Sequence, residues 1–178
     1  MTYFFRLLLT LNATSLIGVV YLIKQKILIT KYFNVSFEIP ENLEYVLYFL
    51  IPLLTTLLSL WMANFLDTES IEKNVLQVEQ ANNAYLPSYL GYFFVALSIT
   101  DSTTFIYVYS ILFVFTFLSQ TLYFNPLFLL YGYKFYYIVN SNNVRVFVIT
   151  RKNLKLPETA KFPKLYSINN FTFIDKEL

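Results

Sequence analysis

The sequence predicts an all-α membrane protein with four transmembrane helices and a small β-rich cytoplasmic C-terminal tail. Hydrophobic residues make up 57% of the 178 residues and charged residues only 13%, and the mean hydropathy is +0.53. Soluble domains usually carry about 25% charged residues. Four long stretches contain no charged residue, and strand-forming residues follow them. We therefore expect a four-helix transmembrane domain over 1–130 and a cytoplasmic tail over 131–178.

The first two transmembrane helices are predicted over about 4–23 and 45–66. The 17 residues between Arg6 and Lys24 and the 22 residues between Glu44 and Asp67 are uncharged, and a helix needs roughly 20 apolar residues to cross a bilayer. The first apolar run also resembles a secretory signal, but no convincing A-x-A cleavage site follows it, so we expect a retained anchor.

The third and fourth helices are predicted over about 85–100 and 105–124. Residues 101–104 form the turn between them, because the short side-chain oxygens of Asp, Ser and Thr suit a helix N-cap. Proline at position 126 ends the fourth helix. Four spans place both termini on one side, and that side would hold ten Lys and Arg residues against three on the other. The positive-inside rule therefore predicts cytoplasmic termini.

The connector between the second and third helices is acidic. Ile71, Val75 and Val78 recur at helical spacing with polar residues between them, so we expect a short amphipathic helix. Because an acidic face does not favour anionic lipid, it would contact a protein partner or solvent. The candidate partner-docking residues of the connector are Asp67, Glu69, Glu72 and Glu79.

The tail is predicted to form two pairs of strands. Segments 133–139 and 144–150 flank a turn at 140–143, and segments 165–168 and 171–174 flank a second turn. A basic run between the pairs suits anionic headgroups, nucleic acid or an acidic protein, although we favour an ordinary positive-inside flank. Without a recognised motif, we expect no direct nucleic-acid binding. The candidate docking residues of the tail are Lys134, Arg145, Arg151, Lys152 and Lys155.

Polar residues inside the spans are expected to hold helices together. The four uncharged stretches, of which the first is 7–23, contain no Asp, Glu, Lys, Arg or His, which disfavours a pump or an ion-coupled transporter. Hydroxyl and amide groups can bond across helices or line a pore, and we favour helix contacts. Proline in the second helix is expected to kink it. These candidate helix-packing or pore-lining residues are Asn12, Thr14, Gly18, Pro52, Thr55, Ser59 and Gln120.

The composition also excludes many kinds of catalysis. The chain has no His and no Cys, so a thiolate nucleophile, a Cys/His zinc site and a Ser-His-Asp relay cannot form. Its three glycines are too far apart for a phosphate-binding loop. The remaining acid-base groups are loop carboxylates that resemble solvated surface charge. We therefore expect no enzyme, no cofactor and no metal site.

One segment and the overall layout resemble a known family. The stretch 125–136, NPLFLLYGYKFY, leads into a β-rich segment that ends with Ile149, Thr150, Arg151 and Lys152. With four spans and a cytoplasmic C-terminal part, the chain resembles KwaA, the membrane subunit of the two-gene Kiwa anti-phage defence system. That resemblance implies a homo-oligomer, such as a tetramer, in the bacterial inner membrane. It also implies a cytosolic DNA-binding effector subunit as partner and a response to phage attack at the envelope.

Three functions fit these features. The first is a non-enzymatic oligomeric sensor or anchor, whose partners would be the lipid bilayer, further copies of itself and a recruited cytosolic effector. The second is an inner-membrane immunity protein against a pore-forming toxin, for which the tail would matter less. The third is a small membrane pore, in which Asn12 and Thr55 would face water. The resemblance favours the first.

Overall fold

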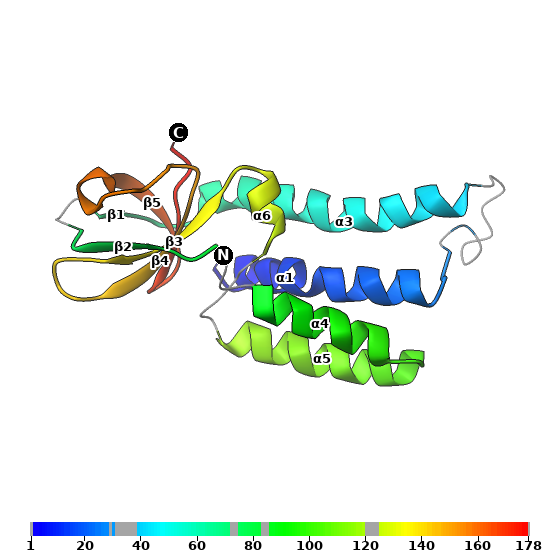
Figure 1. The fold of residues 1–178 in the computed structure, drawn as a ribbon. Helices are drawn as coiled ribbons and strands as arrows, with labels where there is room; N and C mark the ends of the chain where they lie inside the picture. The colour runs from blue at the N-terminus through cyan, green and yellow to red at the C-terminus, as the bar shows by residue number, and fades with distance from the viewer. Residues whose placement is uncertain are drawn as a thin grey trace.

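The computed structural model describes residues 2–28, 30, 39–71, 75–82, 86–119 and 125–177. A bundle of long helices carries a β-sheet at one end, and both termini lie at that end (Figure 1). The helices are α1 Thr2–Lys24, α3 Glu41–Met62, α4 Leu86–Ser98, α5 Ser102–Ser119 and the short α6 Leu127–Leu130, with 3₁₀ turns η1 Ala63–Phe65 and η2 Pro157–Thr159.

Three of the described helices are long and apolar enough to cross a membrane. They cover Tyr3–Lys24, Glu41–Phe65 and Ser102–Ser119. The third predicted span differs, because the described helix α4 has only 13 residues and is about 20 Å long. Residue 85, at the start of the predicted third span, and residues 120–124, at the end of the fourth, lie outside the described residues.

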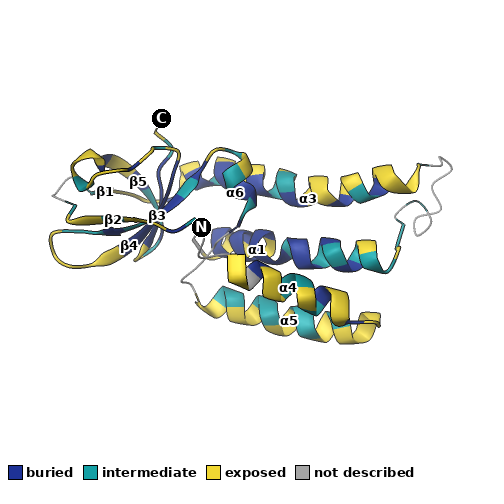
Figure 2. Ribbon diagram, viewed as in Figure 1, coloured by how far each residue is buried: buried dark blue, intermediate teal, exposed yellow. Residues whose placement is uncertain are grey.

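Helix α1 is the centre of the bundle and contacts α3, α4 and α5. The ring of Tyr21 in α1 stacks on the ring of Phe105 in α5, with the ring centres 3.8 Å apart. Helix α5 has no buried residue over Ser102–Ser119, and Figure 2 shows its outer side exposed while α1 is largely buried. Its apolar outer surface suits contact with lipid. The predicted cap at residue 101 is confirmed, because the Asp101 carboxylate accepts a hydrogen bond from the Thr104 amide at 2.8 Å.

The predicted all-α fold class is wrong, because the helices share the structure with a six-stranded mixed sheet in the order β1-β5-β6-β4-β3-β2. All neighbouring strands are antiparallel except β4 and β6, which are parallel. The strands are β1 Thr68–Ile71, β2 Gln77–Gln80, β3 Lys134–Val139, β4 Arg145–Thr150, β5 Phe162–Asn169 and β6 Thr172–Ile174.

Both predicted strand pairs of the tail are present. Strands β3 and β4 pair from Lys134 with Thr150 to Val139 with Arg145, and the turn between them contains Asn143 with a φ of 57°. Strands β5 and β6 also pair, and their turn is fixed by the Asn169 side chain, which accepts a hydrogen bond from the Phe171 amide at 2.9 Å. Asn favours such turns because its side chain bonds to nearby backbone and tolerates positive φ.

The predicted amphipathic helix of the connector is wrong. The connector supplies β1 and β2, the two edge strands of the sheet, and residues 72–74 between them lie outside the described part. Strand β1 pairs with β5 and β2 pairs with β3. The connector therefore forms backbone hydrogen bonds with strands of the tail, which it could not form as an isolated helix. Ile71, Val75 and Val78, whose spacing suggested a helix, pack instead against one apolar core of the sheet.

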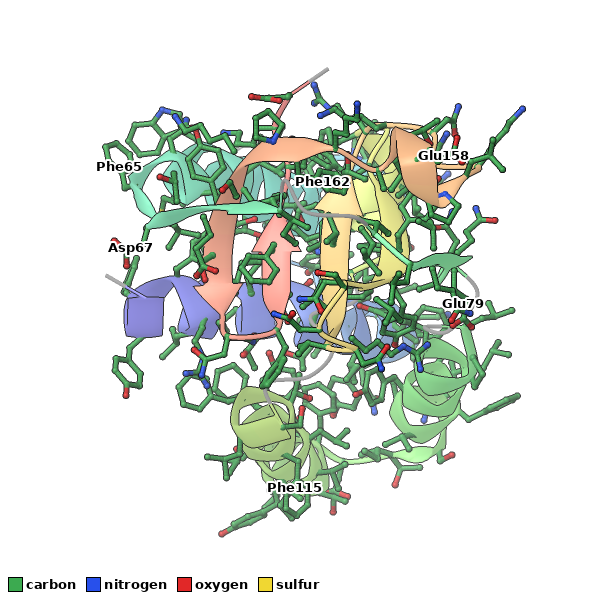
Figure 3. The ribbon with its side chains drawn as sticks, turned by 90° about the vertical axis from the view of Figure 1, so that its left-hand side faces the viewer. Phe65, Asp67, Glu79, Phe115, Glu158 and Phe162 are labelled. Carbon is green, nitrogen blue, oxygen red and sulfur yellow. The ribbon has the colours of Figure 1, made fainter. Side chains whose placement is uncertain are left out.

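The two faces of the sheet belong to different cores. The face toward the bundle carries Phe135, Phe147 and Ile149, which share a core with Phe5 of α1 and Leu60 of α3. The outer face is covered by the segment between β4 and β5, with Leu154, Ala160 and Phe162 in its core. Figure 3 views this outer face, with α1 passing behind the strands. The sheet is therefore an integral cap on the bundle end.

We expect Ile149→Ala to lower the free energy of unfolding by about 2–5 kcal/mol, because it leaves a cavity in the shared core. Ile149 is 0% exposed, whereas Leu156 is 57% exposed, so Leu156→Ala is the matched control and should change little. The measurement is denaturant unfolding of both variants in detergent micelles. Equal losses would contradict a core that joins the sheet to the bundle.

Candidate functional site

The acidic docking candidates lie on opposite edges of the sheet. Asp67 precedes β1 and Glu69 lies on it, whereas Glu79 lies on β2. Figure 3 shows Asp67 and Glu79 at opposite sides of the sheet. Glu72 lies outside the described residues. The connector therefore does not present Asp67, Glu69 and Glu79 as one acidic surface.

The β2 edge uses its acidic residue internally. The Glu79 carboxylate pairs with the Arg145 guanidinium at 2.7 Å, and more than half of each side chain is exposed. The same guanidinium lies 4.0 Å from the centre of the Tyr137 ring. Burial raises the pKa of the Tyr137 hydroxyl, and the Arg145 charge partly opposes that rise. Glu79 is therefore a partner of Arg145 as well as a docking candidate.

The β1 edge keeps its acidic side chains exposed. Neither Asp67 nor Glu69 forms an ion pair with any described residue. The backbone of Asp67 is fixed, because its carbonyl accepts a hydrogen bond from the Ser167 amide at 2.8 Å. This edge thus presents negative charge from a rigid backbone.

Most of the basic candidates contact other groups of the sheet domain. The Lys134 ammonium donates a hydrogen bond to the Asn153 side chain, and the Arg151 guanidinium lies 4.7 Å from the centre of the Tyr133 ring. Burial raises the pKa of the Tyr133 hydroxyl, against the lowering effect of Arg151. Lys155 is exposed. The basic run therefore contributes to the fold at this end of the sheet.

A buried polar cluster fixes the C-terminal end of β6 and was missed by sequence reasoning. The Thr150 hydroxyl donates to the Asp175 carboxylate at 2.7 Å, and both residues are fully buried. The Lys152 ammonium lies 3.3 Å from the same carboxylate and 3.5 Å from that of Glu177. The sequence around Asp175 has no periodic pattern that predicts these contacts, because they depend on the parallel pairing of β4 with β6.

The chain end also binds the end of α3. The Lys176 ammonium donates to the Leu60 carbonyl at 2.8 Å and to the Asn64 side chain at 2.6 Å. A cation is favourable at a helix C-terminus, where carbonyl groups lack partners within the helix. Burial lowers the pKa of the Lys176 ammonium, and the nearby Arg151 charge lowers it further. This contact ties the sheet to α3 and had no sequence signal.

Several polar residues of the spans join helices. The buried Asn12 amide of α1 donates to the Thr55 carbonyl of α3 at 3.2 Å, and the Thr14 hydroxyl lies 3.1 Å from the Tyr109 hydroxyl of α5. The Ser59 hydroxyl donates to the Thr56 carbonyl within α3 at 2.7 Å. The Asn12 and Thr14 contacts therefore support helix packing, whereas the Ser59 bond stays within one helix.

The remaining candidates of the spans make fewer contacts. A Cβ atom added at Gly18 would meet no atom within 4 Å, so none of the described helices approaches it closely. Pro52 lies inside α3, and its carbonyl accepts hydrogen bonds from the Thr55 and Thr56 hydroxyls at 3.1 and 2.7 Å. Gln120 lies outside the described residues. The described residues contain no group of three or more His, Cys, Asp or Glu that could hold a metal ion.

Comparison with known proteins identifies one family. The family model described as anti-phage protein KwaA matches residues 5–174, which include every helix from α3 to α5 and all six strands. This match confirms the resemblance that the segment after residue 125 suggested. No curated protein and no solved structure gives a match.

We expect Asn12→Ala to destabilise the bundle by about 0.6–2 kcal/mol, the range of hydrogen bonds between membrane helices. The control is Asn42→Ala, because Asn42 is exposed in the first turn of α3. The thermal unfolding midpoint in micelles and the ion flux of reconstituted vesicles would both be measured. A normal midpoint with altered flux would favour the pore over helix packing.

Proposed function

This chain belongs to the KwaA family of anti-phage proteins, and from this premise we propose that it is a non-enzymatic, oligomeric sensor and anchor. It would lie in the bacterial inner membrane and recruit a cytosolic effector subunit during phage defence. The observation that carries the proposal is the sheet fixed on the end of an apolar bundle through one shared core. Such a domain can present a docking surface at a set place on the membrane.

The same core offers a route from the membrane to the docking surface. Phe5 of α1 and Leu60 of α3 pack with Phe147 and Ile149 of the sheet. Close-packed interiors have low compressibility and transmit displacement, so a change in the packing of the two helices would displace the sheet. The Lys176 contact with the Leu60 carbonyl adds a second link to α3. A membrane perturbation at phage attack would thus alter the sheet that an effector binds.

The sheet is proposed to face the cytoplasm. Both termini lie at the sheet end of the bundle (Figure 1). The described basic residues at that end include Arg6, Lys134, Arg145, Arg151 and Lys152. By the positive-inside rule, this end belongs on the cytoplasmic side of the membrane. Both termini would then be cytoplasmic, and a cytosolic effector would reach the sheet directly.

The β1 edge is the docking surface that we favour. Asp67 and Glu69 are exposed there without an ion pair among the described residues. An edge strand also presents backbone groups that a strand of a partner can pair with. A partner with a basic strand or surface would therefore fit this edge better than the β2 edge, where Glu79 already pairs with Arg145.

We expect Glu69→Lys to reduce recovery of the effector by at least about tenfold in an affinity pull-down from the native host, because like charges across an interface cost several kcal/mol. Glu158→Lys makes the same charge change at an exposed residue of η2 and should leave recovery unchanged. Deleting the tail after position 126 would not test the docking surface, because the deletion would remove β3 to β6 and leave β1 and β2 without partner strands. If wild type and Glu69→Lys recover equal amounts of effector, the β1 edge is not the docking surface. If wild type recovers no cytosolic protein, the anchor function is wrong.

A further inference from the structure

A large cavity lies where the sheet meets the bundle. Its volume is about 880 Å³, and its walls come from the start of α1, the end of α5, strands β3 and β4 and the turn between β5 and β6. Pockets of this size commonly hold small molecules. The docking function proposed above uses the sheet edge and leaves this cavity without a role.

The polar wall of the cavity is positively charged. Arg6 contributes from α1 and Arg145 contributes from β4, and none of the described lining residues is acidic. Arg6 is 9% exposed, and its guanidinium lies 5.6 Å from the ring centres of Tyr3 and Phe117. The nearest acidic partner of Arg145 is Glu79, which lies outside the lining. Two arginines on different walls suit an anion with several oxygens, because a guanidinium can donate two parallel hydrogen bonds to a phosphate.

The wall also has an apolar part, beside the uncharged polar residues Ser119, Asn169, Asn170 and Thr172. Leu118, Phe147, Ile168 and Phe171 line the cavity beside the arginines. Phe171 is 58% exposed, so part of this apolar wall opens to the surroundings. A cavity that combines guanidinium groups with an open apolar wall fits an amphiphile better than a free inorganic anion.

The cavity also lies at the depth of lipid headgroups. Arg6 and Lys24 are the first and last charged residues of α1, and the 18 steps between them correspond to about 27 Å of helix. That length is close to the thickness of the hydrocarbon core, about 30 Å. At the far end the Lys24 ammonium donates to the Ile99 carbonyl at 2.6 Å. Arg6 therefore marks the boundary of the leaflet next to the sheet.

We propose that the cavity binds the phosphodiester headgroup of an anionic phospholipid from the leaflet next to the sheet, with Arg6 and Arg145 as its phosphate ligands. The inference rests on the membrane insertion included in the proposed function. Basic pockets at the cytoplasmic ends of membrane helices bind anionic headgroups in this way. The bound lipid would contact α1, α5 and the sheet at once, so lipid composition would affect the joint between bundle and sheet.

The test uses the full chain in nanodiscs and native mass spectrometry, with phosphatidylglycerol and phosphatidylcholine of identical acyl chains as probes. We expect wild type to retain phosphatidylglycerol at least about tenfold better, because both lipids carry the phosphodiester but the choline cation of phosphatidylcholine would be repelled by the two arginines. Arg6→Gln and Arg145→Gln should each remove that preference. Arg151→Gln removes an exposed arginine at the other end of the sheet and should preserve it.

Glu79→Gln distinguishes lipid binding from a folding effect. It breaks the same ion pair as Arg145→Gln but leaves the Arg145 guanidinium in place, so we expect undiminished lipid retention. Loss of retention in Glu79→Gln, or an equal loss in Arg151→Gln, would overturn the site. Competition by glycerol phosphate as strong as that by lipid would assign the cavity to a soluble phosphate compound instead. A chain that inserts but shows no lipid preference rejects only this site, whereas failure to insert rejects the proposed function.

Discussion

The apolar core that the sheet shares with the bundle is the constraint on which the rest of the structure depends. Phe135, Phe147 and Ile149 form its sheet side, and Phe5 and Leu60 belong to its helix side. Separation would expose both surfaces to water at about 25 cal/mol per Å² of apolar area. The sheet is therefore held against the bundle by burial, and its position follows that of the helix ends.

The path of the chain strengthens this connection. After α3 the chain forms both edge strands, then returns through α4 and α5 before it supplies the four central strands. The β1 edge therefore continues directly from the end of α3, and the β2 edge leads toward α4. A change in the spacing of α3 and α4 would act on opposite edges of one sheet. The position of the sheet therefore depends on how α3 and α4 are packed.

Sequence reasoning found the features that depend on local composition. Charge-free stretches predict apolar helices because charge in hydrocarbon is costly, and three described helices are long and apolar enough to cross a membrane. The short oxygen-bearing side chain of Asp101 marks a helix start. The edge strands had no such signal. In strand β1, Thr68 pairs with Tyr166, which lies far later in the sequence. Buried and exposed residues do not alternate along this strand. Three apolar residues of the connector fitted a helical period by coincidence, and the Lys176 contact with α3 depends wholly on tertiary structure.

The charges of the sheet domain explain why its basic and acidic residues differ in role. Lys152 pairs with Asp175 within the domain, and Arg145 pairs with Glu79 through one guanidinium nitrogen, which leaves other donors of that group for the cavity. These basic residues thus also support the fold of the sheet domain. Asp67 and Glu69 have no corresponding partner among the described residues. Unpaired charge on a rigid edge loses little conformational entropy on binding, which is the physical reason for proposing the β1 edge rather than the β2 edge as the docking surface.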